Sequence, residues 1–119
     1  MNIRSLAKGL TYCGEAKGKR QTYYVFESAA GFVVMSASRT KRASGYFNLV
    51  RRDAVSRIRK SYAGRQDVTA KQLAVRSRGA GVRDALHALN VLYVLVATGA
   101  AKRDDRYQDT RLHFNIAPR

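Results

Sequence analysis

The sequence predicts an α+β fold built as a single domain over residues 1–119. Two segments rich in aromatic and β-branched residues flank a glycine-containing turn near the N-terminus, and three segments with helical spacing of apolar residues follow. The last segment alternates apolar and polar residues with a period of two. A chain of 119 residues suits one hydrophobic core, and a hydrophobic content of 45% is normal for a globular protein. The predicted order is hairpin, helix, helix, helix, hairpin.

The N-terminal unit, residues 1–47, is predicted to hold a lead-in and one β-hairpin. Residues 1–20 are polar with scattered basic side chains, which predicts an irregular segment with at most a short strand. The stretch "TYYVFESAAGFVVMSAS" predicts strands at 22–27 and 32–37 joined through "SAAG". A basic loop then leads to the second unit, residues 48–116.

The first predicted helix begins where the apolar period changes to four. The polar Asn48 is a suitable N-cap, and Gly64 is expected to end the helix. Arginine and lysine fall mostly outside the apolar stripe, so the helix is amphipathic. The stripe consists of Val50, Ala54, Ile58 and Tyr62.

Two further helices follow a connector, "RQDV", that can form a brief strand. Thr69 and Gln72 have the spacing of a capping box, which predicts a helix over 70–77. After "RGAG", a broad apolar stripe predicts a helix over 82–98, and its second half should be buried because it is apolar nearly all round. Gly99 is the expected stop.

The C-terminal segment predicts two short strands around a polar tip. Leu112, Phe114 and Ile116 alternate with polar residues, as in a strand with one buried face. Asp104 and Asp105 suit the turn between the strands.

The stretches "TAKQLAVRS", "RGAG", "VRDALHALNVLYVLVATG" and "AAKRDDRYQDTRLHFNI" together resemble a winged helix-turn-helix protein. The resemblance covers residues 48–116 and implies three helices plus a C-terminal β-wing, here with an additional N-terminal β-hairpin. It implies double-stranded DNA as the ligand and a role in transcription regulation. Helix 82–98 would read the major groove, and wing 100–116 would contact the backbone.

The charge of the chain supports a polyanionic partner. There are 23 lysines and arginines against 8 acidic residues, a formal net charge of +15. Nucleic acid is the partner we favour over an anionic membrane surface or an acidic protein. The longest apolar block, 91–97, is too short to span a bilayer, and the N-terminal residues do not form a signal peptide. We therefore expect an intracellular, cytoplasmic protein, nucleoid-associated if the source is prokaryotic.

The candidate base-reading residues are Arg83, His87 and Asn90. Their spacings of four and three put them on one helix face, and arginine and asparagine can recognise guanine and adenine. The alternative is a solvated polar face on a core helix. Asp84 would repel phosphate, so it is expected to stabilise the helix N-terminus instead.

Further basic residues flank the predicted reading helix. Arg76 and Arg78 would lie beside the flanking phosphates, or would compensate the dipole at the end of their helix. In the wing, acidic neighbours either pair with the basic residues or end the strands. The cations of the basic segment 39–60 contact phosphate or form a solvated surface, and the sequence leaves both open. The wing candidates are Lys102, Arg103, Arg106 and Arg111.

No catalytic residue, metal site or cofactor is predicted. Cys13 is the single cysteine, and His87 and His113 are far apart in sequence, which excludes the common zinc sets. No glycine-rich phosphate loop precedes a helix. The aromatic residues of the N-terminal hairpin are assigned to the core or to a dimer interface, with stacking on single strands as the less favoured reading. RNA or ribosome binding, a protein-interaction module and a homodimer remain alternatives.

Overall fold

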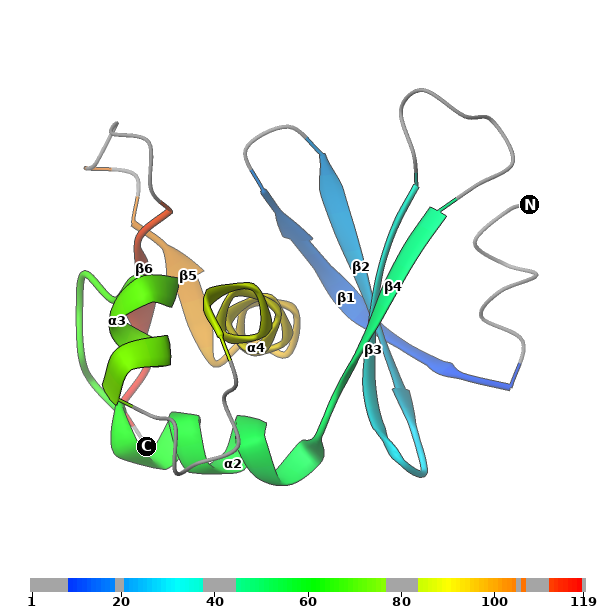
Figure 1. The fold of residues 1–119 in the computed structure, drawn as a ribbon, viewed down its shortest axis with the longest axis horizontal. Helices are drawn as coiled ribbons and strands as arrows, with labels where there is room; N and C mark the ends of the chain where they lie inside the picture. Colours follow the sequence, from blue (N-terminus) through cyan, green and yellow to red (C-terminus); the bar gives the residue numbers. More distant parts are fainter. Residues whose placement is uncertain are drawn as a thin grey trace.

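The computed structural model describes residues 9–18, 21–37, 45–76, 84–104, 106 and 112–118. Within them the fold is α+β, with a four-stranded and a two-stranded antiparallel sheet and helix α4 between the two sheets (Figure 1). The elements are β1 (Thr11–Lys17), β2 (Thr22–Ser28), β3 (Gly31–Ala37), β4 (Gly45–Val50), α2 (Arg52–Ser61), α3 (Ala70–Arg76), α4 (Ala85–Ala97), β5 (Ala101–Arg103) and β6 (Phe114–Ile116).

The larger sheet is an antiparallel meander in the order β1-β2-β3-β4. Its central hairpin, β2–β3, confirms the hairpin predicted from the sequence. Strand β1 lies within the predicted lead-in, where a short strand was allowed for. A bulge between Tyr12 and Gly14 interrupts its alternation. Strand β4 occupies the predicted start of the first helix. Asn48 is therefore a strand residue and not an N-cap, and Val50 is buried in the sheet opposite Phe32.

Helix α2 begins one residue after β4 and is fixed to the β2–β3 turn by Arg52. The Arg52 guanidinium donates to the Glu27 carboxylate at 3.0 Å, to the Ser28 carbonyl at 2.8 Å and to the Ala29 carbonyl at 3.3 Å. It also lies 5.7 Å from the centre of the Phe32 ring. These contacts hold the start of α2 on the sheet, in place of a side-chain N-cap.

The local signals at the other helix ends are confirmed. Thr69 and Gln72 exchange backbone and side-chain hydrogen bonds at 3.2 and 3.3 Å, as a capping box requires. Asp84 caps α4 by accepting from the His87 amide at 2.8 Å. Gly99 follows α4 with a φ of +83°, the left-handed conformation that ends a helix.

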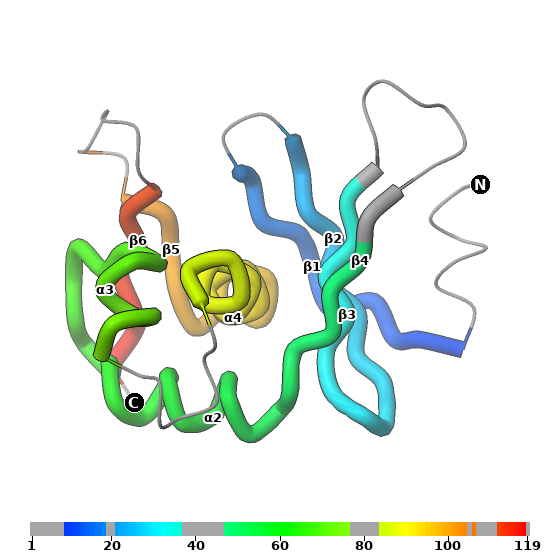
Figure 2. The backbone as a smooth tube through the Cα atoms, viewed as in Figure 1, coloured from blue at the N-terminus to red at the C-terminus, as the bar shows by residue number. Residues whose placement is uncertain are grey.

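Helix α4 forms the centre of the main core. It contacts all four strands of the larger sheet as well as α2, α3 and β5 (Figure 2). The Tyr93 ring stacks on Tyr23 of β2 with centroids 4.3 Å apart, and it meets the edge of Phe114 of β6 at 6.3 Å. The larger sheet therefore covers part of the apolar surface of this helix, and the predicted burial of its second half is confirmed.

The two-stranded sheet confirms the predicted pair of C-terminal strands. The predicted brief strand is an isolated bridge, in which Val68 exchanges backbone hydrogen bonds of 2.8 and 2.9 Å with Phe114. Beside this bridge, the His113 imidazole contacts the Asp67 carboxylate. The chain between α2 and α3 is thereby fixed to β6.

The two sheets also meet each other directly at β1 and β5. Arg103 of β5 donates from Nη1 to the Lys17 carbonyl of β1 at 2.9 Å. In the middle of β1, the Gly14 backbone packs on the last turn of α4. A Cβ atom added at Gly14 would lie 2.5 Å from the Ala97 carbonyl oxygen.

Candidate nucleic-acid interface

Two of the predicted base-reading residues lie in the interior. His87 is 8% exposed and Asn90 is 3% exposed, because the face of α4 that was expected to meet DNA lies against the larger sheet. Asn90 donates from Nδ2 to the Leu86 carbonyl of its own helix at 2.9 Å. Burial removes both side chains from any surface that a duplex could touch. The expectation of an exposed reading face at these two positions is therefore corrected.

The flanking candidates divide into those that the structure describes and those that it does not. Arg76 is exposed in the last turn of α3. Arg78, Arg83 and Arg111 lie outside the described residues, so their expected contacts stay predictions.

The described wing candidates have three different environments. Lys102 is exposed on β5. Arg103 reaches back to β1, and its Nε is buried without a hydrogen-bond partner among the described residues. Arg106 contacts both carboxylate oxygens of Asp104, at 2.8 and 2.6 Å. The expected pairing of wing acids with wing arginines is thus confirmed at Asp104, and Lys102 is the described wing residue best placed to meet a ligand.

The described carboxylates are mostly engaged within the protein. The engaged carboxylates are Asp53 with Arg51, Glu27 with Arg52, Asp67 with His113, Asp84 with the His87 amide, and Asp104 with Arg106. Several exposed cations therefore face solvent with no carboxylate beside them among the described residues. These cations are Arg57, Arg59, Lys60, Lys71, Arg76 and Lys102.

Asp104 is the carboxylate most strongly held in its charged form. Hydrogen bonds from the Arg106 side chain lower the pKa of Asp104 to about 2, aided by the Arg106 backbone amide and by the Asn115 side chain. An unperturbed aspartate has a pKa of about 3.9. The contact between Asp104 and Arg106 thus stabilises the tip of the two-stranded sheet wherever Asp104 is ionised.

Acid should remove this contribution in a defined pH range. The pKa of Asp104 is lower in the folded state, so its stabilisation is complete above about pH 4 and is lost as pH falls toward 2. We expect Asp104→Asn to reduce the loss of stability over that range, measured by urea unfolding at successive pH values. Arg106→Gln removes the main cause of the shift and should have the same effect. Variants with the same acid profile as the wild type would contradict the assignment.

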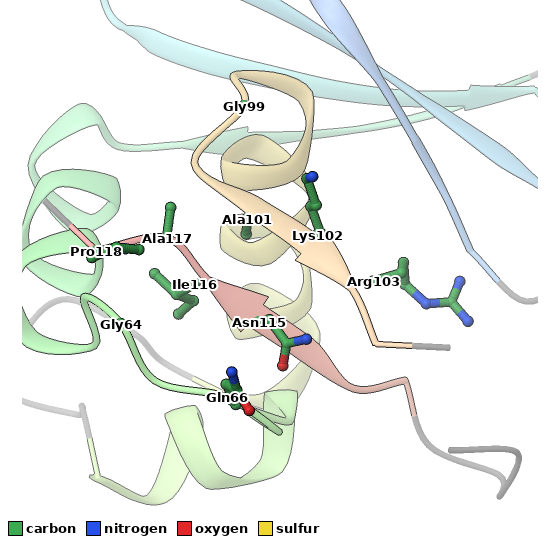
Figure 3. Close-up of a pocket in the computed structure, with 10 residues that line it drawn as sticks. All are labelled: Gly64, Gln66, Gly99, Ala101, Lys102, Arg103, Asn115, Ile116, Ala117 and Pro118. Carbon is green, nitrogen blue, oxygen red and sulfur yellow. The ribbon is translucent and has the colours of Figure 1, made fainter. Parts of the chain in front are cut away.

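A pocket of about 320 Å³ lies on the two-stranded sheet, against the chain that follows α2 (Figure 3). Lys102 and Asn115 come from the two strands, and Gln66 comes from the segment between α2 and α3. Lys102, which has no carboxylate partner within the described part of the chain, lines the pocket beside two amide side chains. Its walls can therefore donate hydrogen bonds to an anionic group.

A second pocket, of about 300 Å³, lies between the larger sheet and the N-terminal half of α4. We call it the seam pocket. Its polar lining residues include Gln21, Ser36, Asn48 and Asn90, and none of the described residues that line it is charged. The sequence did not indicate this site, since Ser36 and Asn48 are far from Asn90 along the chain. The alternation of β3 and β4, which points Ser36 and Asn48 to the same face, was the available signal.

Comparison with known proteins finds no matching family model, no similar curated protein and no similar solved structure. Within the part of the chain that the structure describes, no three His, Cys, Asp or Glu side chains lie close enough together to hold a metal ion. No helix among these residues has both the length and the apolar character needed to cross a membrane.

Proposed function

We propose that this protein binds nucleic acid, with duplex DNA as the ligand, chiefly through contacts to the phosphate backbone. The observation that carries the proposal is the set of exposed lysines and arginines on α2, α3 and β5 that have no carboxylate partner among the described residues. Such side chains attract a polyanion, and their contacts to phosphate release bound counterions. Internal pairing of the acids leaves this attraction largely uncompensated.

We further propose that the part from α2 to β6 works as a winged helix-turn-helix unit. The order α2, Val68, α3, α4, β5, β6 supports this, as does the pairing of Val68 with β6. In this arrangement Arg76 of α3 and Lys102 of β5 would contact phosphates on either side of the α3–α4 connection, to which Arg78 and Arg83 belong. Because the larger sheet covers His87 and Asn90, the proposal assigns base reading to neither.

The direct test is the salt dependence of DNA affinity. Each phosphate contact contributes about −0.9 to the slope of log K against log salt, so the double variant Lys71→Gln/Arg76→Gln should reduce the magnitude of the slope by up to about 2. Fluorescence anisotropy with a labelled duplex measures the slope. Arg51→Gln/Arg52→Gln is the matched control, because it removes the same charge from side chains that are already paired.

Three outcomes would change the proposal. Equal slopes for the two double variants would show that α3 is not the contact surface. Tighter binding of a structured RNA than of a duplex DNA of equal length would assign the ligand as RNA. Failure to bind either at low salt would refute nucleic-acid binding. Circular dichroism of each variant confirms that it is folded.

Selection of bound sequences from random duplex DNA tests how bases are read. With His87 and Asn90 buried, we expect little enrichment of any motif at moderate salt. A strongly enriched motif that disappears in Arg83→Ala would show instead that Arg83, which precedes α4, contacts bases.

A further inference from the structure

We propose that the seam pocket binds an unpaired nucleobase. This inference rests on the proposed function, since it names the part of a nucleic acid or nucleotide that a separate site would take. The pocket lies between the inner face of the larger sheet and α4, away from the cations assigned to phosphate contact. Its size of about 300 Å³ is within the range of small-molecule sites.

Two oxygen atoms that reach the pocket, on side chains that are otherwise buried, have no hydrogen-bond partner among the described residues. Ser36 is 6% exposed and Asn90 is 3% exposed. Asn90 uses its Nδ2 group on the Leu86 carbonyl, and neither its Oδ1 nor the Ser36 hydroxyl forms a hydrogen bond within the described residues. Both oxygens are available to accept hydrogen bonds from a ligand in the cavity.

The described lining residues supply no counter-charge for an ionic ligand group. None of them is charged, although the chain as a whole has a formal charge of +15. A phosphate or carboxylate would lie in this pocket without a counter-charge, which is unfavourable. Gln21, Asn48 and Asn90 carry amides, which can each donate and accept hydrogen bonds. A neutral ligand with both donors and acceptors matches this set, as the edge of a nucleobase does.

Aromatic side chains supply the flat surfaces that a base needs. The stacked rings of Tyr23 and Tyr93 form one wall, with an interplanar angle of 19°. At the mouth, Phe47 is 60% exposed and Leu86 is 63% exposed. Proteins bind splayed-out bases by stacking them on such rings while amides and hydroxyls pair with the base edge. A bound base would also cover part of the exposed Leu86 side chain.

The charge near one end of the pocket determines on which side the sugar and phosphate of a bound nucleotide would lie. At one end, Asp84 and His87 line an adjoining hollow that shares Asn48 and Asn90 with the pocket. Near the other end, the Gly18 amide donates to the Gln21 carbonyl at 2.9 Å, in the turn that follows Lys17 of β1. The carboxylate of Asp84 repels phosphate at its end of the pocket. The sugar and phosphate should therefore leave the pocket on the Gln21 side.

The test is a nuclear magnetic resonance titration of the side-chain amides of Asn48 and Asn90. One arm adds the free nucleosides one at a time, and the other adds a single-stranded oligonucleotide. Saturable shifts of both amides with nucleosides would identify a free nucleoside or nucleotide as the ligand. Shifts with the oligonucleotide alone would identify a base held in a strand. No shift in either arm would overturn the proposal.

Variants separate this site from the phosphate-contact surface. Ser36→Ala and Asn48→Ala should each weaken base binding about tenfold, the effect expected for one lost hydrogen bond. Gln66→Ala is the matched control, because its amide lines the pocket on the other sheet. If both pocket variants bind with unchanged affinity, the seam pocket is not the site. Salt-dependent duplex binding would remain intact in that case, so a failure here is distinguishable from a failure of the proposed function.

Discussion

Replacement of Phe114 by alanine is expected to lower the free energy of unfolding by about 3–5 kcal/mol, the range for a large aromatic side chain lost from a core. Phe114 is fully buried and is among the largest buried side chains. It lies where the Val68 bridge, β6 and Tyr93 meet, so alanine leaves a cavity lined by elements that are fixed on several sides. Urea or thermal unfolding measures the change.

Phe47→Ala is the control for this prediction. It removes the same side chain from a position on β4 that is 60% exposed. Surface substitutions of this kind usually change stability by no more than about 0.5 kcal/mol. A loss for Phe114→Ala as small as that for Phe47→Ala would mean that the two-stranded sheet does not close the core as described.

Gly14→Ala is expected to separate β1 from the end of α4. The added Cβ would lie 2.5 Å from the Ala97 carbonyl oxygen, a distance that requires the backbone to move. Overpacking of this kind costs about 1–3 kcal/mol. Gly14 also has a φ of +154°, which costs a residue with a side chain about 1–3 kcal/mol more. Urea unfolding should therefore show a large loss of stability.

Gly99→Ala isolates the backbone part of this effect. Gly99 also has a positive φ, +83°, but a Cβ atom there would meet nothing within 4 Å. Its replacement should cost only the conformational strain, about 1–2 kcal/mol. If Gly14→Ala lowers the free energy of unfolding by no more than Gly99→Ala does, the contact between β1 and α4 can adjust to the added Cβ atom without a loss of stability.

Short-range signals in the sequence predicted the parts of the fold that short-range physics determines. The capping box at Thr69 and Gln72 and the stop at Gly99 each depend on a few neighbouring residues, so one sequence is sufficient to find them. The same holds for the β2–β3 hairpin. Strand β1 was predicted only as an optional short strand, because its bulge interrupts the alternation. Strand β4 was missed because Val50 has helical spacing from Ala54.

The candidate site was less predictable because it depends on what covers α4. The spacing of His87 and Asn90 correctly places them on one side of a helix, but spacing cannot show that a sheet lies over that side. Polar residue type suggested exposure, and tertiary packing determined burial instead. Ser36 and Asn48 join Asn90 only through the register of β3 and β4. The exposed cations, by contrast, follow directly from composition and helical period.

The hydrogen bond from Arg103 to the Lys17 carbonyl joins residues 86 positions apart, which has a consequence for biosynthesis. The strands of the larger sheet leave the ribosome early, yet the helix that covers their inner face and the strand that β1 meets are translated late. Pairings over such sequence distances form slowly, because a long loop must close first. During translation the apolar inner face of the early strands is therefore exposed until α4 has been synthesised. In this interval the nascent chain most needs a chaperone.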